Sequence, residues 1–61
     1  MNDFILFNDV NSKKNAVRKS AIFSVYEDED DDDIVVIATS EVNFETNESF
    51  DSIISKLKNS I

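Results

Sequence analysis

The sequence predicts a small α+β domain, with an antiparallel sheet of four to five strands followed by one C-terminal amphipathic helix. Two observations support this prediction. Short β-branched and aromatic runs alternate with turn-forming residues up to about residue 46. Beyond that point the apolar residues take the spacing of a helix. The chain has 61 residues, so we expect one domain over residues 1–61, with its sheet curled into an SH3-like or open barrel.

The predicted strands are residues 3–10, 15–19, 21–27, 34–39 and 42–46. The turn residues that follow the first apolar run predict a hairpin. Ile22 and Val25 break strict alternation, which predicts a β-bulge in the third strand. The continuous run from Ile34 to Ala38 is typical of a central strand that is buried on both faces.

A helix is predicted over about residues 50–60, because apolar residues recur there on one helical face: Phe50, Ile53, Ile54, Leu57 and Ile61. Ser49 is expected to cap the first turn. Asp51 near the start and Lys56 and Lys58 near the end complement the helix dipole.

Missing residue types exclude much of the known enzyme chemistry. The chain has no Gly, Pro, Cys, His or Trp. It therefore has no thiolate or imidazole for nucleophilic catalysis or zinc binding, and no glycine-rich phosphate loop. We expect no enzyme activity, no catalytic residues, no cofactor and no metal. The absence of Cys is consistent with a cytoplasmic protein, and no apolar run is long enough to predict a membrane span.

The net charge of −7 comes from one segment. Residues 27–33 are seven consecutive acids, whereas the rest of the chain carries six acids and six bases. Like charges at this density predict a solvated loop. Two other interpretations stay open, a weak Ca²⁺ site and an imitation of nucleic-acid phosphates. The bases Lys13, Lys14, Arg18 and Lys19 form a cluster that is expected to pair with the acidic loop or to bind a nucleotide.

Several segments resemble the FlbD-like family of small β-sheet proteins. Residues 6–14 (LFNDVNSKK) are similar to the family's apolar opening and its "Leu-Asn-Gly-Lys" turn. Residues 20–27 are similar to its "Asp-x-Ile-x-x-Ile-x-Glu", residues 34–45 to its hairpin, and residues 47–50 to the entry of its C-terminal helix. Ser12 stands where the family has a turn glycine. Similar short proteins occur in phages.

The resemblance implies a small twisted sheet or open barrel with a helix, and it implies no catalytic residues. The five phenylalanines are expected in the core: Phe4, Phe7, Phe23, Phe44 and Phe50. Apolar side chains nevertheless fall on both faces of the first and third predicted strands. We therefore expect barrel closure or a homo-oligomer to cover the surplus.

The sequence thus predicts a non-enzymatic protein-interaction module that binds a partner protein and itself, with no direct nucleic-acid or membrane binding. The alternative is an acidic, phage-encoded inhibitor that mimics nucleic acid through residues 27–33 and blocks a defence or nucleic-acid-processing enzyme in the host cytoplasm. The expected partner-binding residues are Glu27, Asp28, Glu29, Asp30, Asp31, Asp32, Asp33, Phe4, Phe7 and Phe23.

Overall fold

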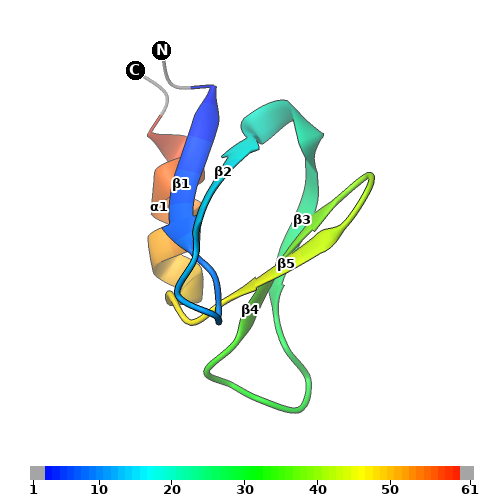
Figure 1. Ribbon diagram of the computed structural model, residues 1–61, viewed down its shortest axis with the longest axis vertical. Helices are drawn as coiled ribbons and strands as arrows, with labels where there is room; N and C mark the ends of the chain where they lie inside the picture. Colours follow the sequence, from blue (N-terminus) through cyan, green and yellow to red (C-terminus); the bar gives the residue numbers. More distant parts are fainter. Residues whose placement is uncertain (1–2, 60–61) are drawn as a thin grey trace.

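A computed structural model describes residues 3–59 and contains five strands and one α-helix in the expected order (Figure 1). The elements are β1 (Phe4–Asn8), β2 (Lys14–Arg18), η1 (Lys19–Ala21), β3 (Ile22–Glu27), β4 (Val35–Thr39), β5 (Asn43–Thr46) and α1 (Phe50–Lys58). The α+β class, the five strands and the C-terminal helix are therefore confirmed. Residues 60 and 61, at the end of the predicted helix, lie outside the described residues.

The strands form two antiparallel sheets, a β1–β2 hairpin and a β3–β4–β5 sheet. The two sheets meet at one corner. There Asp9 bridges Thr46, and the backbone N–H of Val10 donates to the carbonyl oxygen of Glu45 at 3.0 Å. Outside this corner no backbone pairing joins the sheets within residues 3–59, so the structure shows no closed barrel.

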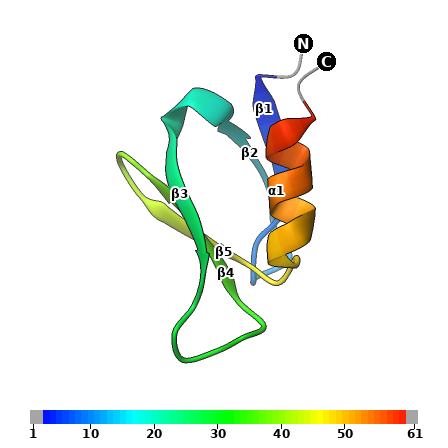
Figure 2. The same ribbon diagram turned by 180° about the vertical axis from the view of Figure 1, so that it is seen from behind.

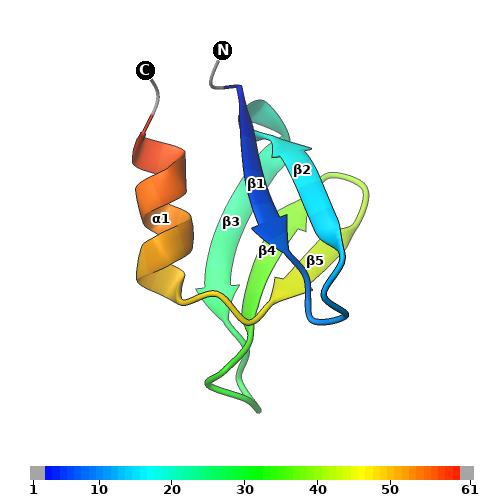
Figure 3. The same cartoon turned by 60° about the vertical axis from the view of Figure 1, so that its left-hand side comes forward.

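The core lies between the two sheets and α1 (Figure 3). Ile5 and Val17 face it from the hairpin, Ile37 from the sheet and Ile53 from the helix. Each of these side chains is at most 6% exposed. Ser49 caps the start of α1, as expected, because its hydroxyl oxygen accepts a hydrogen bond from the N–H of Ser52 at 3.1 Å. The helix that begins there buries the side chain of Ile53. The core covers one side of the hairpin and one side of the three-stranded sheet. The uncovered side of the hairpin therefore points away from the uncovered side of the sheet.

Strand β4 lies in the middle of its sheet, as its β-branched run predicts. Three successive residues, Val35, Val36 and Ile37, are buried, so both faces of the strand are covered. The pairing of β3 with β4 shifts register between Ile22 and Ser24, which agrees with the predicted bulge.

The expectation that all five phenylalanines are core residues is wrong for two of them. Phe7 is buried, and its ring meets that of Phe44 edge to face, with 5.8 Å between the ring centroids. Phe50 also packs against the core. Phe4 is 47% exposed because it lies on the outer side of β1, and Phe23 is 74% exposed at the register shift of β3. They leave apolar area open to water.

Candidate partner-binding surfaces

The acidic run joins β3 to β4 and lies at the opposite end of the molecule from η1 (Figures 1 and 2). Its backbone is folded by local hydrogen bonds. The N–H of Asp28 donates to the carbonyl oxygen of Ile34 at 2.8 Å, which closes the loop. The carboxylates of Asp28 and Asp31 accept from the N–H groups of Asp30 and Asp33, at 3.1 and 2.9 Å. These are Asx turns, so the loop has a defined backbone path.

The carboxylates of this loop are not neutralised from within the described chain. All of them are exposed except that of Asp28, which is half-buried. The only ion pair among residues 3–59 joins Lys56 to Glu48 at 2.7 Å, away from the loop. No group of acidic residues in the same range is arranged to hold a metal ion. The negative charge of the loop is therefore available to an outside partner.

Two of the four clustered bases have partners outside the acidic loop. The guanidinium of Arg18 lies 4.8 Å from the ring centroid of Phe4, and the ammonium of Lys19 donates to the carbonyl oxygen of Asn59 at 3.1 Å. Neither base pairs with residues 27–33 in the described chain, so the expected pairing with the acidic loop is not observed. Lys14 and Arg18 border two different hollows.

A hollow of about 380 Å³ adjoins the acidic loop on the outer side of the β3–β4–β5 sheet. The strand register places Tyr26, Val36 and Glu45 side by side across the three strands. Val36 is 5% exposed and Tyr26 is 45% exposed, so an aromatic ring stands beside an apolar floor. Asp28 also lines the hollow, whereas no lysine or arginine does so in the described chain.

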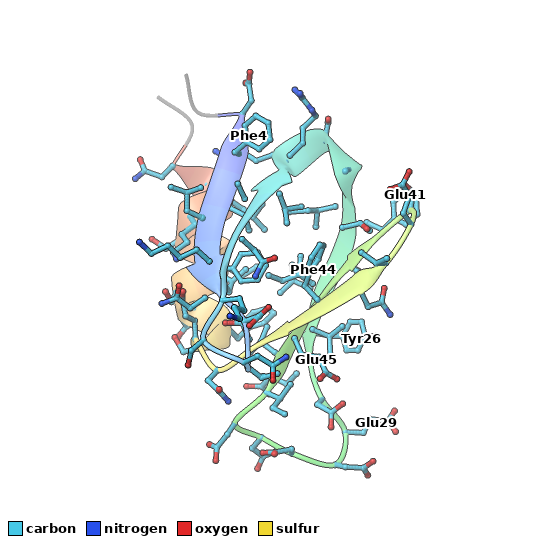
Figure 4. The ribbon with its side chains drawn as sticks, in the orientation of Figure 1. Phe4, Tyr26, Glu29, Glu41, Phe44 and Glu45 are labelled. Atoms are coloured by element: carbon cyan, nitrogen blue, oxygen red, sulfur yellow. The ribbon has the colours of Figure 1, made fainter. Side chains whose placement is uncertain are left out.

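Figure 4 shows Tyr26 and Glu45 at the same end of the molecule as Glu29, whereas Glu41 lies at the other end of the sheet. We call this surface the acidic face, and it consists of residues 27–33 with Tyr26 and Glu45. It joins negative charge to one exposed aromatic ring. Tyr26 and Glu45 are additions to the residues predicted from sequence, because their proximity depends on strand register.

The predicted partner-binding phenylalanines divide between different environments. Phe7 is 4% exposed and packs in the core, so it is withdrawn as a contact residue. Phe23 is 74% exposed, but it lies near the start of β3, beside η1 and away from the acidic loop. Phe4 lies on the outer side of the β1–β2 hairpin. The alternation of exposed and buried residues along β1 explains the difference between Phe4 and Phe7.

The outer side of the hairpin forms a second surface, which we call the hairpin face. The register pairs Phe4 with Arg18, Leu6 with Ala16, and Asn8 with Lys14. All six side chains are exposed, and Leu6 retains 66% of its accessible area. A hollow of about 480 Å³ borders Leu6, Lys14 and Ala16. This face combines apolar side chains with positive charge.

Two carboxylates have structural partners that lower their pKa values. The pKa of Asp9 lies below its ordinary value because its carboxylate accepts hydrogen bonds from the N–H of Lys13, the side chain of Asn15 and the N–H of Asn11. Partial burial tends to raise the pKa of Glu48. Its hydrogen bonds with Lys56 and Ser52 outweigh that effect, and the pKa is lowered. These two acids serve the fold.

Comparisons with protein-family models, with curated proteins and with solved structures give no match to this chain. Among the described residues, no helix has the length and apolar character needed to cross a membrane.

Proposed function

We propose that this chain is a non-enzymatic protein-interaction module that binds a positively charged protein partner through its acidic face, in the cytoplasm. The observation that supports this most is the uncompensated charge of residues 27–33 on a folded loop. Those carboxylates contribute nothing to the apolar core and repel one another. Charge of one sign at an interface speeds the encounter with an opposite surface and selects between partners.

The exposed aromatic ring of Tyr26 supports the same proposal. Tyr26 lies on β3, immediately before the acidic loop. Aromatic residues commonly anchor protein interfaces, whereas charges at the rim mainly affect the association rate. The ring would provide contact area and the loop would orient the partner. The proposal also includes association of the chain with itself, because Phe4 and Leu6 remain exposed on the other side.

The finer description of the fold is part of the proposal. An SH3-like curl is supported by the corner at which Asp9 and Val10 of the hairpin reach β5. A relationship to the FlbD-like proteins is supported by Ser12, whose φ of 64° lies in the region that favours the glycine of that family's turn. Neither feature implies an enzymatic activity.

A second candidate function is the inhibition of a nucleic-acid-processing or defence enzyme, as a phage-encoded protein. It is favoured by the Asx turns, which hold successive carboxylates of the loop on a defined backbone. A row of fixed negative charges can occupy a groove that otherwise receives phosphates. In this second candidate function, the basic surface that the acidic loop contacts is the nucleic-acid site of the partner enzyme.

Capture from a lysate of the native host, using two matched variants, tests the proposed function. The loop triple is Glu29→Gln/Asp30→Asn/Asp32→Asn, and the distant triple is Asp3→Asn/Glu41→Gln/Asp51→Asn. Both remove three carboxylates, so the two variants have the same net charge. None of the six side chains accepts a hydrogen bond from another described residue. The fold should therefore tolerate both changes.

We expect the loop triple to recover its main captured proteins at about one tenth of the wild-type amount or less, as quantified by mass spectrometry. The distant triple should match the wild type. Equal losses in both variants would show that only net charge matters, and undiminished capture by the loop triple would contradict the proposal. Addition of excess duplex DNA separates the two functions. The DNA should release the captured protein only if the acidic loop occupies the nucleic-acid site of that protein.

A further inference from the structure

The two exposed surfaces of this molecule have opposite charge. The hairpin face presents Lys14 and Arg18 around Leu6 and Phe4, whereas the acidic face presents residues 27–33 beside the ring of Tyr26. The inner sides of the hairpin and of the sheet share one core, so their outer sides point in opposite directions. Each copy therefore carries an apolar surface flanked by bases and an aromatic ring flanked by acids.

We propose that the hairpin face of one copy docks on the acidic face of the next, so that the chain associates head to tail. Charge complementarity identifies a second copy as the occupant. If each face instead packed against a copy of itself, the bases of the hairpin face would approach only other bases, and the acidic loop would approach only other acids. Like-charge contacts of this kind are unfavourable across an interface.

The size of the molecule is sufficient for such a contact. A stable interface takes about 800 Å² from each partner. That area is under a fifth of the 4408 Å² accessible surface of the chain. A contact between unlike faces leaves one face of each kind open, so it forms rings or open chains instead of stopping at a symmetric dimer.

Two variants that each disable one face provide the test. The hairpin-face variant is Lys14→Glu/Arg18→Glu, and the acidic-face variant combines Tyr26→Ser with the loop triple. The changed side chains are all exposed, and thermal melting checks that each variant is folded. Sedimentation at 50 mM NaCl, over a concentration series up to 1 mM, measures the mass of each protein alone and of their 1:1 mixture.

The wild type should show a mass that rises with concentration beyond that of a dimer, and 500 mM NaCl should weaken its association about tenfold or more. Each variant alone should remain at the 6.9 kDa of one chain. Their mixture should form a 1:1 dimer, because it pairs the one intact acidic face with the one intact hairpin face. A monomeric wild type, self-association of either variant, or a mixture that stays monomeric would overturn the inference.

This inference uses the acidic face of the proposed function but adds the hairpin face. The two ideas can therefore fail separately. If the hairpin-face variant loses self-association and still captures the host partner, both ideas hold. A monomeric wild type with loop-dependent capture overturns only the head-to-tail contact. Restored dimers in the mixture, together with full capture by the loop triple, overturn only the partner-binding function.

Discussion

Ser12 ends the turn between β1 and β2 with a φ of 64°, and it is the only residue with positive φ among residues 3–59. A side chain in this left-handed region costs roughly 1 kcal/mol relative to glycine. We expect Ser12→Gly to raise the free energy of unfolding by about 0.5–1 kcal/mol in urea titrations. Ser12→Val should lower it. A stability loss in the glycine variant would show that this serine is not strained.

Asp9 organises the same turn through three hydrogen bonds, from Asn11, Lys13 and Asn15. The pKa of Asp9 is lowered in the folded state, chiefly by the bond from the Lys13 N–H. Its contribution to stability is therefore present above its ordinary pKa of 3.8 and is lost as the pH falls through the lower folded value.

We accordingly expect Asp9→Ala to melt at a lower temperature than the wild type at neutral pH. The gap between the two proteins should narrow as the pH falls below about 4. Asp3→Ala, at an exposed acid with no hydrogen bond to the described side chains, serves as the control and should change the melting temperature little. A gap that stays constant with pH would show that the ionised form of Asp9 makes no special contribution.

At the scale of elements, α1 and the segment just before it cover the free edge of β1 with side chains. The ammonium of Lys56 donates to the carbonyl oxygen of Leu6 at 2.6 Å, and the carboxylate of Glu48 accepts from the N–H of Asn8 at 3.4 Å. Lys56 and Glu48 also pair with each other at 2.7 Å. An open strand edge invites pairing with other chains, so these contacts protect β1 while they dock the helix.

We expect Lys56→Met to lower the free energy of unfolding by about 1 kcal/mol, because methionine retains the apolar stem but loses the hydrogen bond and the ion pair. In a domain of this size that corresponds to a fall of about 4–8 °C in melting temperature. Lys58→Met removes an exposed lysine from the same helix turn and should have less than half this effect. Equal effects of the two substitutions would contradict the role assigned to Lys56.

Local patterns predict the elements well where one segment determines its own structure. The spacing of Phe50, Ile53 and Leu57 predicts α1, Ser49 predicts its start, and the β-branched run predicts the central strand. The contacts between segments far apart in the sequence are not predictable in this way. The corner between Asp9 and Thr46 and the bond from Lys56 to β1 depend on how the hairpin folds over the sheet.

For the candidate surfaces too, the sequence predicts what is contiguous in the chain but not which distant residues become neighbours. Residues 27–33 are conspicuous in the sequence because they are contiguous. The sequence could not assign Phe4 to the outside and Phe7 to the core, because the alternation of a four-residue apolar run is compatible with either register. Phe23 falls where the pairing of β3 with β4 shifts register, so alternation does not predict its exposure. Tyr26 and Glu45 lie 19 positions apart in the chain and become neighbours only through their shared partner Val36.

At the scale of the whole molecule, the acids divide by role. Asp9 and Glu48 hold the fold together, whereas residues 27–33 bear charge that the fold does not use. Two unit charges about 6 Å apart in water repel by roughly 0.7 kcal/mol. Because the seven acids are contiguous, they also repel one another in the unfolded chain, so only part of this cost falls on the folded state.

The central claim is that this loop serves binding and not stability, and the free energy of unfolding tests it most directly. The variant replaces every loop Asp by Asn and every loop Glu by Gln, which keeps the oxygens that accept from Asp30 and Asp33. Urea titration in about 20 mM salt should show the variant to be more stable than the wild type by about 1 kcal/mol. The difference should shrink in 0.5 M salt, where such charges are screened. A variant that is less stable than the wild type would show that the fold needs these carboxylates, and would contradict the claim.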